Sequence, residues 1–222
     1  MSVFDRLKTD CASEWAAYVD HDFVRGMADG SLPLDAFRTY LKQDYLFLIH
    51  FSRAYALAIY KSQTLGDMRR GMAGLKTILE GEMELHVELC AKWGIARKEL
   101  ETVAEESETL AYTRFVLESG LRGDLLDLQV ALAPCILGYG EIGARHRGVV
   151  PEGTDGAPAY ARWFAEYASD DYQNAARDFC DWMDQTASAY LTEARYPVLR
   201  RIFSEASRLE ADFWQMGFKN LG

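Results

Sequence analysis

The feature that most limits the possible folds is the segment 37–62, FRTYLKQDYLFLIHFSRAYALAIYKS, which contains neither proline nor glycine. Within it, aromatic side chains recur at spacings of three and four residues, as Tyr40, Phe47 and Phe51 illustrate. This spacing places them on one face of an α-helix, whereas a strand would require strict alternation. Pro33 precedes the segment and suits a first helical turn. The segment therefore predicts one long amphipathic helix.

The rest of the chain repeats this helical pattern, and no segment alternates as a strand would. The most irregular stretch, 148–158, is rich in glycine, proline and aspartate but too short for a flexible linker between domains. We therefore expect an all-α, multi-helix bundle that forms a single domain over residues 1–222. Gly120 is expected to end one of its helices. The further expected helices are 66–94, 97–104, 107–120, 123–148, 159–169, 170–190 and 194–218.

Charge and cysteine content restrict the functions that the chain can have. The net charge is −10 and the pI about 4.9, so a large basic surface for nucleic acid or for an anionic membrane is not expected. We expect no apolar stretch long enough to span a bilayer, and the N-terminal segment lacks the features of a signal peptide. The four cysteines are far apart in sequence, which gives neither a zinc-finger spacing nor a disulfide framework. These features predict a protein of the reducing cytoplasm.

Residues 132–143, LAPCILGYGEIG, place a proline and a cysteine inside a run that otherwise has the pattern of a buried helix. Pro134 lacks an amide hydrogen and crowds the carbonyl of Val130, so we expect a kink that frees this carbonyl for another partner. Cys135 shares an inward-facing stripe with Tyr139. The kink, the thiol and the small glycines nearby predict the wall of a pocket. The alternative is a small, inert, buried thiol beside a tolerated proline.

Two acidic residues fall on apolar faces of expected helices, namely Asp44 and Glu210. An unpaired buried carboxylate is costly, so each of them needs a partner. For Asp44, an ion pair with Arg53 or Arg114 and a contact with a ligand are equally open alternatives. Glu205 is expected to face solvent, although it lies on the same helix as Glu210.

Patterns that would hold a metal ion are weak. Glu82 and His86 are four residues apart, and Glu141 and His146 are five apart. Carboxylate-bridged di-iron bundles use a Glu-x-x-His motif on each of two helices, together with further acids. Neither pair has this spacing, so no metal site is predicted. His86 is expected to be a hydrogen-bonded structural residue.

Six fragments occur along the chain in one order: FRTYLKQDYLFL, EMELHVELC, LAYTRFVLES, ALAPCILGYGEIG, YARWFAEYAS and EADFWQM. Together they resemble the TenA or thiaminase II family over nearly the whole chain, residues 5–218. The resemblance implies a heme-oxygenase-like helical bundle, usually a homotetramer. It also implies an enzyme that hydrolyses 4-amino-5-aminomethyl-2-methylpyrimidine to the hydroxymethyl pyrimidine and ammonia. Such enzymes also cleave thiamin, and they need neither a metal nor an organic cofactor.

The resemblance assigns roles to individual residues. Cys135, directly after the proline, takes the position of the nucleophile, and Glu210, four residues before Trp214, takes the position of the late catalytic acid. Asp44 matches the acid that binds the 4-amino group of the pyrimidine. The remaining matches are aromatic side chains expected to stack on the ring or to surround it: Phe47, Tyr112, Tyr139 and Tyr167.

Two other functions stay open from the sequence. The first is an oxidase of the same superfamily, either di-iron or cofactor-free, which would need a cluster of histidines and carboxylates. The second is a non-catalytic pyrimidine-binding or regulatory protein. We expect the hydrolase, with a small-molecule aminopyrimidine or thiamin as its partner.

Overall fold

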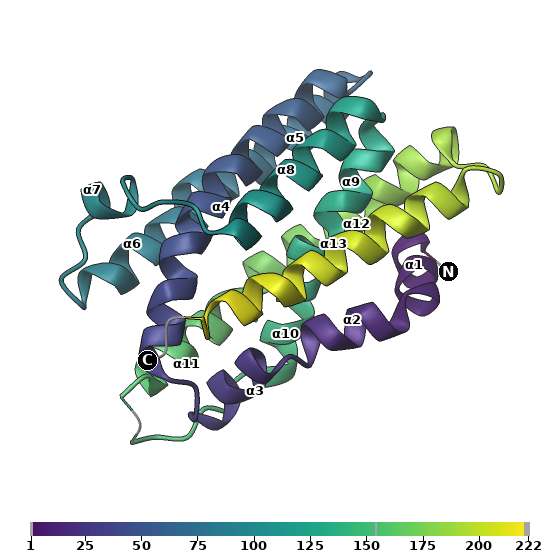
Figure 1. The fold of residues 1–222 in the computed structure, drawn as a ribbon. Coiled ribbons are helices and arrows are strands. Elements are labelled where there is room, and N and C mark those ends of the chain that lie inside the picture. Colours follow the sequence, from purple (N-terminus) through teal and green to yellow (C-terminus); the bar gives the residue numbers. More distant parts are fainter. Residues whose placement is uncertain (1, 154, 220–222) are drawn as a thin grey trace.

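The computed structural model describes residues 2–153 and 155–219, and every regular element within these ranges is a helix (Figure 1). The all-α prediction is therefore confirmed. The α-helices are α1 (Val3–Asp10), α2 (Ala12–Val19), α3 (Asp22–Asp29), α4 (Leu34–Lys61), α5 (Leu65–Thr77), α6 (Met83–Ala91), α7 (Arg97–Leu100), α8 (Ser107–Arg122), α9 (Leu125–Ala133), α10 (Tyr139–His146), α11 (Ala157–Tyr167), α12 (Asp170–Tyr190) and α13 (Tyr196–Met216). Two π-helical turns complete the set: η1 (Ile78–Glu82) and η2 (Pro134–Gly138).

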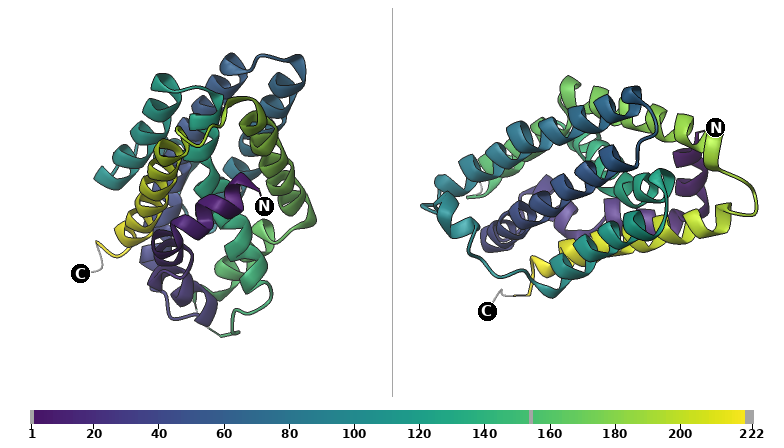
Figure 2. Two further views of the ribbon diagram at one scale, coloured as in Figure 1. Left: turned by 90° about the vertical axis from the view of Figure 1, so that its right-hand side faces the viewer. Right: turned by 90° about the horizontal axis from the view of Figure 1, so that it is seen from above.

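The helices form a bundle in which segments far apart in sequence lie side by side (Figures 1 and 2). α4, α8 and α13 pack against one another, and α5 covers a further side of α4. α9 packs against α4, α8, α12 and α13, so it lies inside the bundle. The N-terminal α2 packs on α13, and α11 packs on α10 and α3. α1 and the C-terminal end of α13 lie toward opposite ends of the bundle (Figure 1).

α4 is the predicted long helix. It begins at Leu34, directly after Pro33, and continues to Lys61. Its 28 residues extend over about 42 Å at 1.5 Å per residue, so it reaches along most of the bundle. Asp44 and Phe47, one turn apart, are both buried on this helix.

Two π turns interrupt helices that the sequence patterns predict as continuous. η1 divides the expected helix 66–94 into α5 and α6, and η2 begins at Pro134. A π turn pairs each amide with the carbonyl five residues back, and such single-turn bulges occur often at functional sites. The sequence predicts a kink at Pro134, and the structure has the π turn η2 beginning there. The sequence carries no comparable signal at η1.

The helix that was expected to end at Gly120 continues to Arg122 as part of α8, so this prediction is wrong. A Cβ atom at Gly120 would lie 2.8 Å from Leu128 Cδ1 and 2.9 Å from Leu57 Cδ2. The glycine therefore permits α8 to pack closely on α9 and α4, and it does not terminate the helix.

The segment Leu125–His146 corrects a second prediction, namely that no apolar stretch is long enough to span a bilayer. It is 22 residues long and contains an apolar window of 18 residues with a mean hydropathy of 1.3, so its length and composition alone would allow it to cross a membrane. In the structure, 94% of this apolar window is buried inside the protein. Such burial is the environment of the central helix of a bundle, and the segment supplies the core of this one.

The glycines that follow Cys135 allow close packing, as the sequence suggested. A Cβ atom at Gly138 would overlap the ring of Tyr18, and one at Gly143 would lie 2.6 Å from the carbonyl carbon of Tyr167. Gly143 thereby lets α11 approach α10. Because Gly138 and Gly143 have no side chains, Tyr18 and Tyr167 can pack beside the segment that carries the thiol.

Replacing Gly143 by alanine is expected to destabilise the protein by about 1–3 kcal/mol, the usual cost of overpacking a core. The added Cβ would meet backbone atoms of Tyr167 and Ala168, which cannot move aside as a flexible side chain can. Gly140→Ala is the matched control, because its Cβ would meet neighbours only at 3.5 Å and alanine favours the helix. Urea unfolding compares the two variants, and equal stabilities would contradict the packing argument.

Candidate active site

Five polar side chains gather in the core of the bundle, and each comes from a different element. Three are carboxylates, Asp44 on α4, Glu82 on η1 and Glu210 on α13; the others are His86 on α6 and Cys135 on η2. None of the five is more than 9% exposed. Burying several ionisable groups together is costly, and such clusters are typical of functional sites.

Asp44 is held by two hydrogen-bonding partners within the core. The Tyr40 hydroxyl donates to Asp44 Oδ2 at 2.8 Å, and His86 Nε2 lies 2.6 Å from the same oxygen. The alternative of an ion pair with Arg53 or Arg114 is wrong, because both arginines are exposed at the surface. Within the described part of the chain no hydrogen bond reaches Asp44 Oδ1, so this oxygen can accept one from a ligand.

Glu210 accepts a hydrogen bond from the Tyr112 hydroxyl at 2.8 Å. Burial raises the pKa of Glu210 well above its usual value; the Tyr112 hydrogen bond opposes this rise, and the charge of Asp44 adds to it. The carboxyl group therefore holds its proton more tightly than an exposed glutamate does, and it can act as an acid. Glu205 is partly exposed and pairs with Arg208 at 2.6 Å, which confirms that it faces solvent.

The backbone around Cys135 is anchored on both sides by tyrosine hydroxyls. Tyr18 donates to the carbonyl of Pro134 at 3.2 Å, and Tyr172 donates to the carbonyl of Ile136 at 3.1 Å. Both tyrosines are buried, so neither bond competes with solvent. These two bonds therefore fix the backbone that carries the thiol.

The thiol of Cys135 lies in an acidic environment. Burial raises the pKa of Cys135 well above its usual value, and the charges of Glu210, Glu82 and Asp44 raise it further. The thiol therefore keeps its proton in the free protein. Its role as a nucleophile stays a prediction, and any attack by this sulfur must be accompanied by proton transfer to another group.

Aromatic side chains surround the polar groups. The ring centroids of Phe47 and Tyr112 are 4.9 Å apart, with an interplanar angle of 31°. Tyr139 packs against Tyr167 at 5.0 Å and against Trp163 at 5.5 Å. The structure thus gathers in its core the seven residues that the resemblance selects: Cys135, Glu210, Asp44, Phe47, Tyr112, Tyr139 and Tyr167.

His86 and Glu82 join this cluster, although the sequence patterns gave neither a role in it. His86 Nδ1 lies 2.7 Å from the carbonyl oxygen of Glu82, which confirms His86 as a hydrogen-bonded residue. Burial lowers the pKa of His86, but the charge and hydrogen bond of Asp44 outweigh burial and raise it. The signal in the sequence was the spacing of four, which places both side chains on one helix face.

Glu82 has the properties of a proton-transfer group. Its Oε2 accepts a hydrogen bond from the Tyr167 hydroxyl at 3.3 Å. Burial raises the pKa of Glu82 to about 7; the charge of Asp44 adds to this rise, while His86 and the Tyr167 hydrogen bond oppose it. The carboxyl group is therefore divided between its two protonation states near neutral pH, where a general acid or base works best.

Comparison with protein-family models matches residues 9–220 to the TENA/THI-4/PQQC family. The chain belongs to this family. The resemblance to TenA proteins is therefore confirmed. An aminopyrimidine aminohydrolase from Halalkalibacterium halodurans is 38% identical over 204 residues, which cover 92% of this chain and 90% of that protein.

Two solved structures share the fold of this TENA/THI-4/PQQC family member. A TenA family transcription regulator from Silicibacter sp. TM1040 matches with a TM-score of 0.91 and 42% identity, covering 97% of this chain and 96% of that one. A domain of unknown function with a heme oxygenase-like fold, from Shewanella denitrificans, matches with a TM-score of 0.72 and 10% identity, covering 97% and 92%. This second likeness shows the fold alone, and it confirms the predicted heme-oxygenase-like bundle.

A cavity of about 140 Å³ connects the surface of this family member with the polar cluster. Arg70 on α5 and Asp178 on α12 lie on its outer part, where both are exposed. Its buried part is formed by Glu82, Ile136 and Tyr172. The thiol and the other two carboxylates of the cluster are not on its wall. A small molecule that entered between α5 and α12 would therefore meet Glu82 before any other residue of the polar cluster.

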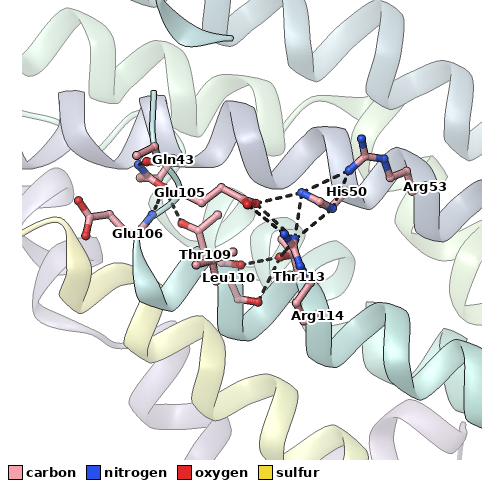
Figure 3. A network of polar contacts seen from close by, with 10 residues as sticks. Gln43, His50, Arg53, Glu105, Glu106, Thr109, Leu110, Thr113 and Arg114 are labelled. Atoms are coloured by element: carbon pink, nitrogen blue, oxygen red, sulfur yellow. Dashed lines mark hydrogen bonds and ion pairs between the residues drawn. The ribbon is translucent and has the colours of Figure 1, made fainter. Parts of the chain in front are cut away.

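A polar network fixes α4 relative to α8 (Figure 3). His50 Nε2 lies 2.9 Å from Glu105 Oε1, and Arg114 pairs with Glu105 Oε2 at 3.0 Å. Nearer the N-terminal end of α4, Gln43 Oε1 accepts a hydrogen bond from the Thr109 hydroxyl at 2.7 Å. Two predicted site residues, Asp44 and Phe47, lie on α4 between Gln43 and His50. The network therefore sets their position relative to α8.

Residues 2–153 and 155–219 contain no group of three His, Cys, Asp or Glu side chains arranged to hold a metal ion. Asp44, Glu82 and His86 instead bond to one another and to tyrosine hydroxyls. The di-iron alternative would require a group of carboxylate and histidine ligands around the metal ions, and the described residues do not form such a group.

Proposed function

We propose that the protein is a hydrolase of thiamin salvage that converts 4-amino-5-aminomethyl-2-methylpyrimidine to 4-amino-5-hydroxymethyl-2-methylpyrimidine and ammonia. The observation that carries the proposal is a buried thiol, Cys135, in the same core as an acid of raised pKa, Glu210, and a carboxyl group, Asp44, with one oxygen that accepts no hydrogen bond from the described residues. The 38% identity to an aminopyrimidine aminohydrolase supports this substrate class.

The same residues can recognise the pyrimidine. Asp44 Oδ1 accepts a hydrogen bond from the 4-amino group, because Oδ2 is already engaged by Tyr40 and His86. Phe47 stacks on the electron-poor ring, and the tyrosines of the site line its edges. These contacts hold a ring carbon within reach of Cys135 Sγ, which supplies the orientation that the addition step needs.

The reaction begins with proton transfer between the substrate and Glu210. Glu210 donates its proton to a ring nitrogen, which makes the ring more electrophilic. The carboxylate that results takes the proton of the Cys135 thiol, and the sulfur adds to a ring carbon. The raised pKa values of both groups support this order, because the thiol is not ionised until Glu210 has given up its own proton.

Addition of the sulfur breaks the aromaticity of the ring, and the electron pair gained by the ring expels the amine from the 5-methylene group. Water then adds to the exocyclic methylene carbon. Loss of the Cys135 thiol restores the aromatic ring and completes the turnover. Thiamin enters the same sequence with its thiazolium ring as the leaving group, so the protein cleaves thiamin as well.

Ammonia release from the aminopyrimidine by the purified protein tests this function. We expect turnover of the aminopyrimidine and slower cleavage of thiamin. Binding of the pyrimidine without turnover would instead identify a pyrimidine-binding protein, and oxygen consumption without hydrolysis would favour the oxidase. Salt-dependent binding to DNA would indicate a regulator, which the net charge of −10 opposes.

We also propose that the protein is a cytoplasmic homotetramer of single-domain subunits, residues 1–222, with neither a nucleic-acid nor a membrane partner. Leu65, Met68 and Met72 support self-association, because they share one face of α5 and are 61%, 38% and 60% exposed. A second copy of the same face would cover this stripe, as in the two-fold interfaces of homo-oligomers. The free cysteines support the cytoplasmic location, and the acidic net charge opposes a nucleic-acid or membrane partner.

Replacing Met72 by lysine is expected to dissociate the tetramer into smaller species, because the charge would be buried at the interface. Val149→Lys is the control, since Val149 is 52% exposed and lies outside α5. Light scattering coupled to size-exclusion chromatography measures the mass of each variant. A wild-type monomer, or a Met72→Lys variant with the wild-type mass, would contradict this interface.

A further inference from the structure

Of the three carboxylates in the polar cluster, Glu82 is the one to which the proposed reaction gives no role. It ends η1, the π turn between α5 and α6, and it is 9% exposed. Its Oε2 accepts the hydrogen bond of Tyr167, and Glu82 also lines the cavity. Of the three carboxylates in the cluster, Glu82 is therefore the one in contact with both the site and the path to solvent.

The charged groups around Glu82 come from several helices. Asp44 on α4 and Glu166 on α11 raise the pKa of Glu82 beyond the effect of burial, whereas His86 on α6 and the Tyr167 hydroxyl lower it. The net result is a pKa of about 7. The other titratable or charged groups that face it or share its cavity are Tyr55, Arg70, Cys135, Tyr172 and Asp178.

We propose that Glu82 serves the leaving-group side of the reaction: its carboxylate receives the ammonium group of the bound substrate and then takes the proton of the water that replaces ammonia. This inference rests on the proposed function. The aminomethyl group is a cation at neutral pH, like other alkyl amines, and its N–H groups form charge-assisted hydrogen bonds with a carboxylate. The thiazolium of thiamin is also a cation but offers no N–H at its ring nitrogen. Glu82 therefore favours the aminopyrimidine over thiamin, because only the aminopyrimidine can donate a hydrogen bond from its leaving group to this carboxylate.

The protons and electrons of this step balance. The C–N bond breaks with its electron pair going to nitrogen, so the ammonium group departs as neutral ammonia. The oxygen of water then forms a bond to the methylene carbon, and one of its protons passes to the Glu82 carboxylate. The protonated Glu82 gives this proton to the departing ammonia, which leaves as an ammonium ion. Glu82 ends the cycle as the carboxylate with which it began.

Binding to a Cys135→Ser variant separates recognition by Glu82 from turnover. Calorimetry compares the Kd of the aminomethyl pyrimidine with that of the hydroxymethyl pyrimidine. Adding Glu82→Gln should weaken binding of the amine by about 10- to 100-fold, the range for a hydrogen bond to a charged group, and leave binding of the alcohol unchanged. Equal losses for both ligands, or no loss for the amine, would overturn the inference. This comparison remains decisive even if the wild type releases no ammonia and the proposed function fails.

Turnover by proteins that retain Cys135 tests the proton transfer. Glu82→Gln should lower kcat for the aminopyrimidine by about 10²- to 10⁴-fold. It should also remove the decline of kcat/KM as the pH falls through about 7, because this decline reports protonation of the Glu82 carboxylate. Glu166→Gln is the matched control: it removes a neighbouring charge, keeps kcat, and moves the decline to lower pH. A Glu82→Gln variant that kept the decline would assign it to another group and overturn the role.

Discussion

Replacing Cys135 by serine is expected to stop ammonia release from the aminopyrimidine, with kcat reduced on the order of 10⁴- to 10⁶-fold, as when another enzyme loses a member of its nucleophilic group. A serine hydroxyl holds its proton more tightly than a thiol and is a weaker nucleophile, and the surrounding carboxylates disfavour its ionisation further. Serine preserves the size of the side chain, and the tyrosine bonds to η2 reach backbone carbonyls. The pyrimidine should therefore still bind.

Cys180→Ser is the matched control for this experiment, because Cys180 is also a free thiol but lies partly exposed on α12. It should retain the wild-type rate. Calorimetry with the hydroxymethyl pyrimidine shows whether the Cys135→Ser site remains intact. A Cys135→Ser protein that still releases ammonia at the wild-type rate would disprove the covalent mechanism and leave water as the attacking group.

Replacing Glu210 by glutamine is expected to lower kcat by about 10²- to 10⁴-fold, the usual contribution of a general acid. Glutamine can still accept the hydrogen bond of Tyr112, but it has no proton to give to the ring nitrogen. Burial raises the pKa of Glu210, so the wild-type enzyme keeps its active, protonated form to higher pH than an exposed glutamate would and loses it as the pH rises further. The variant should lack this alkaline decline in the pH profile.

The control for Glu210 lies on the same helix. Glu205→Gln removes a carboxylate of the same type, but Glu205 is partly exposed and pairs with Arg208. Its pH profile and kcat should match those of the wild type. A large loss in Glu205→Gln together with a small loss in Glu210→Gln would reverse the assignment of the acid.

Much of the fold could be predicted because its signals are local. The spacing of apolar residues in α4 and the break near 148–158 can be read from a few neighbouring positions. The role of Gly120 could not be read in this way, because the atoms that require a glycine belong to Leu57 and Leu128 on other helices. The π turn η1 likewise has no local cause such as the proline of η2.

In the candidate site, too, features set by local sequence could be predicted, whereas contacts between helices could not. Helical periodicity alone placed Asp44 and Glu210 on buried faces, and the resemblance to TenA proteins supplied their proposed roles. The partner of Asp44 was not predictable, because it depends on how α6 packs against α4. Arginine is a common partner of a buried acid, but the core supplies His86 instead. The spacing of Glu82 and His86 is visible in the sequence, but it does not indicate that either residue lies beside Asp44.

The buried carboxylates also couple the stability of the bundle to pH and to its ligands. The folded protein holds protons on Glu82 and Glu210 more tightly than the unfolded chain does, because both pKa values are raised. Their contribution to stability is complete below the ordinary carboxyl pKa of 4.5 and is lost as the pH rises, through about 7 for Glu82. A ligand that binds only the folded state opposes this loss by mass action. The melting temperature can therefore serve as a sensor of site occupancy, and a screen of small aminopyrimidines above pH 7 would rank them without any assay of turnover.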